Sequence, residues 1–265
     1  GPDGGVDNSG TVAPVVSLIA AADEAQIIFS GGASTFFAVS AQADAGVVVN
    51  KRITGSSGIV YLDGDSDSTA DTASNLIEFV DGLMFTAETG LPLVSLTTGI
   101  VPAGKLTLAA KTGVHIEGNM TGAAPNKALV MNSDFDSTGS TGTLTLASGK
   151  TVTSNKSEVT ITAWDIDMAG SLTTGTLALT IHGAEATQTI GLGSTSQDMH
   201  ITDTELGRMS AMFGMTLGSS TSGSIVVSGI SNDNSDAIGT LTLIATKTSA
   251  TVAFTNTPST FNKGI

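Results

Sequence analysis

The sequence predicts an all-β protein, and within that class a right-handed parallel β-helix (β-solenoid) with turns of about 20 residues. Three observations lead to this prediction. Short apolar–polar–apolar segments recur along the whole chain, residues such as Gly, Ser, Asn and Asp fill the intervals, and one stretch of sequence occurs twice. Alternating segments are typical of strands with one buried face, and the residues between them favour turns.

The composition supports many short strands over long helices. Of the 265 residues, 40% are hydrophobic, which is enough for a substantial core. Only 4% are aromatic and 13% are charged, while 32 are Gly. Long helices need runs of Ala, Leu, Glu and Lys, and the chain has few such runs, so a globular α/β fold is disfavoured.

The charge balance excludes several classes of function. Ten Lys and Arg against 24 Asp and Glu give a net charge of -14, so we expect no nucleic-acid partner and no anionic membrane surface. The absence of Cys excludes disulfides, a thiolate metal site and a Cys nucleophile. No apolar run reaches the roughly 18 residues of a membrane helix, so we expect no membrane insertion.

Ten segments are expected to be strands because apolar side chains alternate within them, so that both apolar residues of a segment such as Leu-Thr-Leu point to the same side. In chain order they are residues 17–19, 59–62, 106–108, 144–146, 159–162, 177–179, 199–201, 215–217, 225–227 and 241–243.

The spacing of these strands favours a coil over a β-sandwich. Successive Leu-containing segments start at residues 106, 144, 177 and 241, and these intervals fit two, nearly two and three turns of about 20 residues. A sandwich would need only about seven to nine strands with Greek-key returns. About 13 turns would form a rod on the order of 60 Å long, with inward apolar stacks and outward Thr, Ser and Asp rows.

The repeated stretch pairs residues 16–36 with residues 241–261 without a gap. Eight of the 21 pairs are identical, where chance in so biased a sequence would give about two. We therefore expect Phe29 and Phe254 to occupy equivalent inward positions near opposite ends of one coil. The alternative is that both stretches are ordinary turns, which resemble each other because each solves the same packing problem.

This repeat predicts the domain organisation. Residues 1–4, which begin Gly-Pro, are interpreted as a tag remnant and leader, residues 5–228 as one long repeat unit of the solenoid, and residues 229–265 as the start of the next unit. The partners expected on this interpretation are neighbouring repeats of the same protein, stacked end to end.

One acidic cluster is a candidate metal site. Asp63, Asp65, Asp67 and Asp71 stand at alternate or near-alternate positions, a spacing of oxygen ligands that calcium prefers. The loop lacks the Gly and the bidentate Glu of an EF-hand. Weak calcium binding is therefore one hypothesis, and calcium the one candidate cofactor. The alternative is a solvated loop whose carboxylates serve turns and solubility.

Shorter acidic pairs and threonine rows are weaker candidates. The pairs are Asp134 with Asp136 and Asp165 with Asp167. Outward threonines at the centres of the Leu-Thr-Leu segments and of their relatives could form a flat face for ice or crystalline polysaccharide, although Thr also simply suits an exposed strand. These threonines are Thr107, Thr145, Thr180 and Thr242.

No set of residues singles out a catalytic centre, and we expect no enzymatic activity. Parallel β-helix enzymes that act on polysaccharides need carboxylates or a basic residue in a groove. The chain has two Arg, Arg52 and Arg208, and Arg208 is expected to pair with Glu205 three positions earlier. A carbohydrate-active enzyme stays a less favoured alternative.

The segment from Ile201 to Ile230 resembles the repeats of filamentous-haemagglutinin-like and giant adhesin-like secreted proteins. In those repeats an E-L-x-R-hydrophobic step leads into an L-x-I-G strand and then a G-x-I-x-V strand. The matching residues here are Glu205, Leu206, Arg208, Met209, Leu217, Gly218, Gly223, Ile225 and Val227.

This resemblance implies an extracellular or cell-surface β-helical rod, often part of a very large fibrous protein, with a structural or adhesive role. Extracellular or cell-surface polysaccharide would be a further partner of such a protein. A calcium- or glycan-binding adhesin module is the alternative function.

Overall fold

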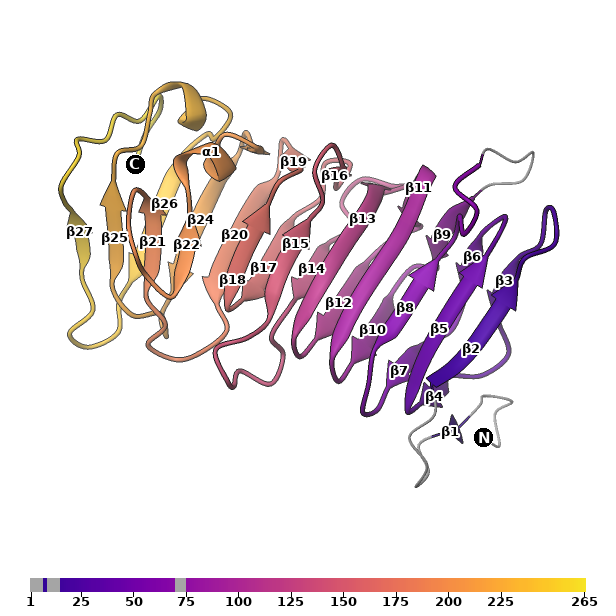
Figure 1. The fold of residues 1–265 in the computed structure, drawn as a ribbon. Helices are drawn as coiled ribbons and strands as arrows, with labels where there is room; N and C mark the ends of the chain where they lie inside the picture. The colour runs from indigo at the N-terminus through magenta and orange to yellow at the C-terminus, as the bar shows by residue number, and fades with distance from the viewer. Residues whose placement is uncertain (1–6, 9–14, 70–74) are drawn as a thin grey trace.

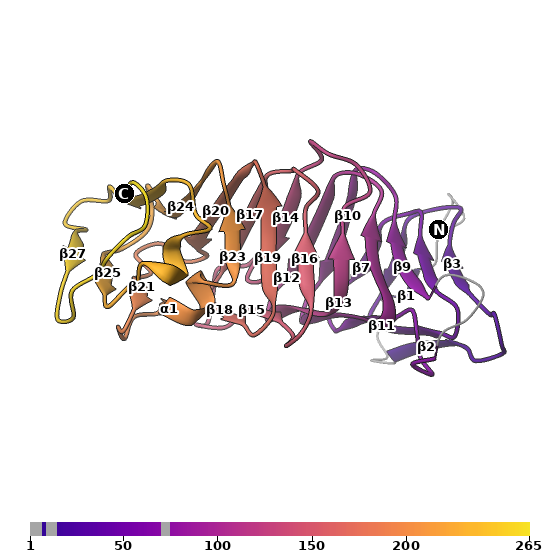
Figure 2. The same ribbon diagram turned by 90° about the horizontal axis from the view of Figure 1, so that it is seen from above.

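The computed structural model describes residues 7–8, 15–69 and 75–265. These residues form an elongated, mostly β structure with strands β2 and β27 at opposite ends (Figure 1). The strands are stacked side by side along the length of the molecule, as the view from above also shows (Figure 2). They pair in parallel throughout three sheets. The predicted all-β class is therefore confirmed.

The first sheet has ten strands. In spatial order they are β1 (Asp7–Asn8), β4 (Ser34–Phe36), β7 (Ile53–Gly55), β10 (Leu83–Ala87), β12 (Leu106–Ala110), β14 (Leu129–Asn132), β17 (Val159–Ala163), β20 (Ala178–Gly183), β24 (Gly214–Ser219) and β26 (Leu241–Ala245).

The second sheet has thirteen strands, and long strands carry it around a corner. Its main path is β2 (Val15–Ala20), β5 (Ala38–Ala43), β8 (Val60–Asp63), β11 (Gly90–Pro102), β13 (Gly113–Thr121), β16 (Thr151–Thr153), β19 (Ser171–Gly175) and β23 (Met209–Ala211). Strand β11 also pairs with a branch made of β9 (Leu76–Phe79), β6 (Val47–Val49) and β3 (Ile27–Phe29), and β13 pairs with β15 (Thr143–Leu146) and through it β18 (Asp165–Met168).

The third sheet has four strands near the C-terminal end. Their order is β22 (Met199–Ile201), β21 (Ile190–Gly193), β25 (Ile225–Ser228) and β27 (Val252–Phe254). Two short helical turns, α1 (Asp203–Leu206) and η1 (Asp233–Ser235), lie beside it. No helix among the described residues is both long enough and apolar enough to cross a membrane.

In the two larger sheets the chain adds strands in sequence order, and each strand pairs with one that comes a turn later. Outside the pairing of β21 with β22, the interval between paired residues runs from 19, for Ser34 and Ile53, to 37, for Leu172 and Met209. The shortest intervals match the expected 20 residues. The longer ones contain inserted loops between consecutive strands, such as residues 133–142 between β14 and β15.

In-register pairing aligns the inward side chains into continuous columns. Two columns run through the first sheet, and nearly all of their members are buried: Leu83, Leu106, Leu129, Val159, Leu179, Met215 and Leu241 in one, and Phe85, Leu108, Met131, Ile161, Ile181, Leu217 and Leu243 in the other. These columns are the predicted apolar stacks. All ten segments predicted to be strands overlap strands of the structure.

Truncation of a column residue should destabilise the whole stack. Phe85 is fully buried and packs edge-to-face against Phe79, with 5.7 Å between ring centroids. Phe85→Ala should lower the free energy of unfolding by about 3–5 kcal/mol, because it leaves a cavity in the column. The neighbouring Met84 is exposed, so Met84→Ala should change it by less than about 0.5 kcal/mol. Denaturant unfolding of both variants checks the contrast, and equal losses would contradict it.

Candidate functional site

The predicted calcium loop begins at the end of β8, and its carboxylates already have protein partners. Asp63 accepts hydrogen bonds from the hydroxyl of Tyr61 at 3.1 Å and from the N–H of Asp65 at 3.1 Å. Burial raises the pKa of Asp63, and burial next to that carboxylate raises the pKa of Tyr61 to about 12. Asp67 is exposed and accepts from Thr69. Asp71 lies outside the described residues.

Asp65 anchors this loop to the next turn. Its side chain is buried, and its Oδ1 accepts from Asn75 Nδ2 at 3.1 Å. Its Oδ2 accepts from the N–H groups of Leu96 at 3.0 Å and Thr97 at 2.7 Å. The carboxylate thus satisfies three donors at a point where β11 carries no ladder partner for them.

The described part of the chain gathers no group of three or more His, Asp or Glu side chains that could hold a metal ion. Calcium binding by Asp63, Asp65, Asp67 and Asp71 stays a prediction. The geometry of the three described members accords with the alternative, in which the carboxylates stabilise turns and corners.

Asp165 and Asp167 differ in how far they are buried. Asp165 is half-buried in β18, its Oδ1 accepts from the N–H of His200 at 2.9 Å, and burial raises its pKa. Asp167 is exposed on the same strand. Asp165 therefore ties β18 to β22, where the second sheet meets the third.

The pair Asp134 and Asp136 is brought together with a basic residue. Lys111 Nζ lies 2.9 Å from Asp136 Oδ2, and the hydroxyl of Thr138 donates a hydrogen bond to the same oxygen. Together the two contacts lower the pKa of Asp136 to about 2. Asp134 is fully buried. Burial and the neighbouring Asp136 carboxylate raise the pKa of Asp134 to about 6. The surroundings of the two carboxyl groups therefore shift their pKa values in opposite directions.

Glu205 and Arg208 do not form the predicted ion pair. Glu205 closes a capping box with Thr202 at the start of α1, and its Oε1 accepts from the N–H of Met168 at 3.0 Å. Arg208 Nη1 donates to the carbonyl oxygen of Met168 at 2.6 Å. Both side chains therefore hold the backbone of the same residue at the end of β18, Met168, and so dock α1 on the sheet. They do not pair because the capping box engages Glu205 instead, and its Thr-x-x-Glu pattern at residues 202–205 was a signal present in the sequence.

A row of threonines crosses the first sheet. Four threonines lie side by side in register on β17, β20, β24 and β26, at the parallel-strand spacing of about 4.8 Å: Thr160, Thr180, Thr216 and Thr242. Thr107 lies in the same row two strands from Thr160, with Val130 between them. Three of the four predicted members therefore share one row. Thr145 instead lies in the second sheet, between His115 and Asp167.

Phe29 and Phe254 lie near opposite ends of the molecule and make the same contact. Phe29 packs edge-to-face on Phe36 with ring centroids 6.4 Å apart, and Phe254 packs in the same way on Phe261 at 6.5 Å. Their positions are nevertheless not equivalent, since β3 belongs to the second sheet and β27 to the third. The repeated stretch keeps its local packing but is displaced to a different face of the molecule.

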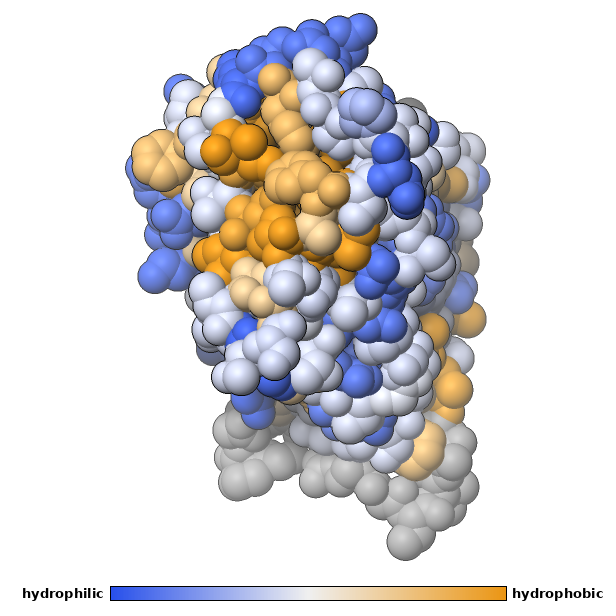
Figure 3. All heavy atoms as spheres, turned by 90° about the vertical axis from the view of Figure 1, so that its left-hand side faces the viewer, coloured by the Kyte–Doolittle hydropathy of each residue, from blue (hydrophilic) through white to orange (hydrophobic). Residues whose placement is uncertain are grey.

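The end rungs expose apolar side chains in register with the core. Phe254 pairs with buried Val227, yet 58% of its own surface is exposed because no described strand follows β27. Figure 3 shows the resulting apolar patch at the C-terminal end. At the other end the core-facing Leu18 and Phe29 are only partly buried, whereas the exposed Ile19 belongs to the outward face, where it pairs with Gln42. Beside them is a hollow of about 380 Å³, lined mainly by Val16, Leu18, Ile27, Ile28, Phe29 and Phe36.

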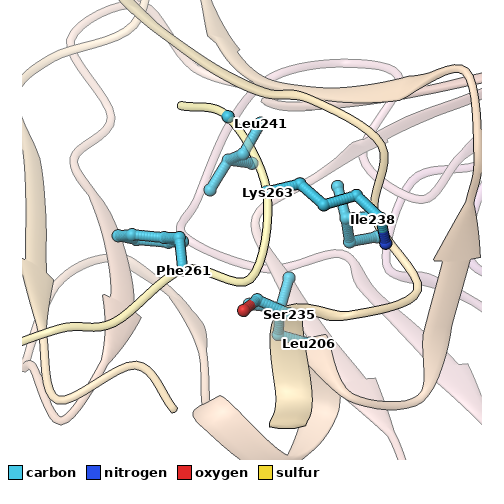
Figure 4. Close-up of a pocket in the computed structure, with 7 residues that line it drawn as sticks. Leu206, Ser235, Ile238, Leu241, Phe261 and Lys263 are labelled. Carbon is cyan, nitrogen blue, oxygen red and sulfur yellow. The ribbon is translucent and has the colours of Figure 1, made fainter. Parts of the chain in front are cut away.

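A small pocket beneath the C-terminal segment is packing space. Leu206, Ile238, Leu241 and Phe261 converge there, with Lys263 beside them (Figure 4). The cavity measures about 10 Å³, room for at most one water molecule, so it is no ligand site.

No family model, curated protein sequence or solved structure shows significant similarity to the chain.

Sequence reasoning missed the different surroundings of the middle aspartates in two related loops. Residues 63–69 (DGDSDST) and 132–138 (NSDFDST) share the spacing of Asp, Asp, Ser and Thr, and this match was a usable signal. The donors around Asp65 come from residues 10, 31 and 32 positions away, so no local pattern could reveal them.

Removal of the Asp65 carboxylate should uncouple its loop from β11. Asp65→Ala should cost about 2–4 kcal/mol of unfolding free energy, because it leaves buried donors without an acceptor. Asp67→Ala should have little measurable effect, since that side chain is exposed. Denaturant unfolding in the presence of a chelator compares the two variants, and a neutral Asp65→Ala would show that the contacts contribute nothing.

Proposed function

We propose that the chain is a rigid segment of a fibrous protein, in which a right-handed β-solenoid carries a structural or adhesive role. The observation that supports this most is the pair of apolar end rungs, left uncovered by the described residues, on a molecule whose strands are stacked along its whole length. Parallel strands joined by crossovers are right-handed in about 98% of cases, which supports the proposed hand of the coil.

The proposed partners are neighbouring repeats of the same protein, stacked end to end. Within the described residues, β2 and β3 at one end and β27 at the other each pair with a single strand, so their outer edges are free to hydrogen-bond. Such a contact joins unlike surfaces, and unlike surfaces generate filaments when they do not close into a ring.

The outermost segments at the two ends differ in charge. Residues 241–265 contain Lys247 and Lys263 and no acid, whereas residues 15–50 contain Asp23, Glu24 and Asp44 and no Lys or Arg. Opposite charges guide association and fix which surfaces meet. They also offset locally the repulsion between bodies that each carry a net charge of -14.

The location outside the cell and the adhesive role rest on the resemblance of residues 201–230 to filamentous-haemagglutinin-like repeats. A carbohydrate-active enzyme is not proposed. Asp134 and Asp136 do converge with Lys111, but Asp134 is buried and a saccharide could not reach it.

End-to-end stacking predicts concentration-dependent self-association. Sedimentation velocity between micromolar and millimolar protein should show growing linear species. Phe254→Ser should weaken association at least about tenfold, because it removes apolar area from the end rung. Phe213→Ser is the control, since Phe213 is also exposed but precedes β24, an inner strand that is paired on both sides. A wild-type monomer at millimolar concentration, or equal effects of both substitutions, would contradict the proposal.

The threonine row favours a second candidate function, the binding of an ordered polysaccharide surface. We expect the protein to co-sediment with insoluble cellulose or chitin, and Thr180→Glu in the row to reduce the bound fraction. Thr145→Glu, in another sheet, should leave binding unchanged. Failure of the wild type to co-sediment would remove this candidate without affecting the rod.

A further inference from the structure

Two corners of the molecule are built from the same loop. We call residues 63–69 the first aspartate loop and residues 132–138 the second. In each, the middle aspartate donates its N–H to the side chain two positions earlier, at 3.1 Å in the first loop and 3.2 Å in the second. In each, the hydroxyl of the final threonine donates to the aspartate two positions earlier. The serine between these two residues has a positive φ, 59° for Ser68 and 55° for Ser137.

The middle aspartates differ in one respect. Asp65 is buried, and its oxygens accept hydrogen bonds from Asn75, Leu96 and Thr97. Asp134 is buried just as completely, but neither of its carboxylate oxygens has a hydrogen-bond partner. A carboxylate taken out of water without donors costs several kcal/mol, so in the second loop something else must supply positive charge.

The protein groups around Asp134 supply it only in part, because Lys111 interacts with this carboxylate electrostatically while no protein group donates a hydrogen bond to its oxygens. The nearby N–H of Thr138 makes no hydrogen bond of normal geometry to Asp134. Lys111 contacts Asp136 and uses only Oδ2 of that side chain, which leaves Asp136 Oδ1 buried and unpartnered as well. Glu185 adds a further negative charge nearby. Three buried carboxylate oxygens therefore lie at this corner without a donor.

We propose that the second aspartate loop binds a hard cation, with calcium as the best fit, between the carboxylate of Asp134 and Oδ1 of Asp136. All three free atoms are anionic oxygens, the ligands that hard cations prefer and that soft metals do not. The two carboxylates already lie within reach of each other. Calcium takes its remaining ligands from carbonyl oxygens, hydroxyls and water, so two acidic residues suffice.

This site is distinct from the calcium loop expected from the sequence. In the first aspartate loop both oxygens of Asp65 accept hydrogen bonds from protein donors, so this carboxylate needs no ion to balance its burial. The proposal is also independent of end-to-end stacking, because the second loop lies between β14 and β15 in the middle of the chain.

Thermal unfolding of the whole chain tests the site. After treatment with a chelator, calcium chloride at about 100 times the dissociation constant should raise the Tm of the wild type by about 5 °C or more. Asp134→Asn should abolish this rise. The matched control is Asp65→Asn in the first loop, which should keep the rise although its starting Tm is lower. Magnesium should have a smaller effect, because it requires stricter geometry.

Isothermal titration calorimetry of the wild type provides a reading that depends on no variant, with one calcium ion per chain expected. An absent rise in the wild type, or an equal rise in all three proteins, would overturn the proposal. A shared proton is the competing explanation. Because the pKa of Asp134 is raised to about 6, a protonated pair would favour the folded state below about pH 4 and lose that advantage as the pH rises through 6.

Such a pH-dependent loss, absent from Asp134→Asn and accompanied by no calcium response, would show that a proton and not a cation satisfies the corner.

Discussion

In-register parallel stacking is the constraint on which the rest of the structure depends. A parallel ladder places each residue of one turn beside its counterpart in the next, so a column that faces the core needs an apolar residue in each of its strands. The column from Leu83 to Leu241 meets this requirement with Leu, Val and Met in seven successive strands. A one-residue slip would turn every member outward, which is why the register is so strictly held.

The corners solve a different problem, because the ladder is interrupted there. Backbone groups that lose their strand partners must be satisfied by side chains. Asp65 does this beneath β11, and Gln188 does it near β18, where its amide donates to the carbonyl oxygens of Ala163 and Trp164. Asp65 and Gln188 therefore supply at these corners the hydrogen bonds that the ladder supplies along the faces. The second aspartate loop is the exception, since its buried carboxylate lacks such a partner.

The ends of the molecule and its corners thus point to separate capacities. At the ends, columns that are buried elsewhere reach the surface, and β2, β3 and β27 each have one edge that no strand of the described residues pairs with. At the corners, loops vary in length and chemistry without disturbing the columns, since each turn contacts mainly its neighbours. A rod built in this way can gain a binding site in one loop at little cost to its stability.

The sequence by itself determined the class of fold and much of the core. Alternation in segments such as Leu106–Leu108 and Leu241–Leu243 correctly predicted strands, their inward faces and the continuous stacks, because these depend on a period of two that is visible locally. Only the tertiary structure decided which sheet each strand joins. The repeated stretch occupies different faces at its two occurrences, because intervals of 19 to 37 residues between paired positions shift where each face begins. The tertiary structure alone also decided that Asp65 has hydrogen-bond donors and Asp134 has none, since the donors to Asp65 come from distant turns.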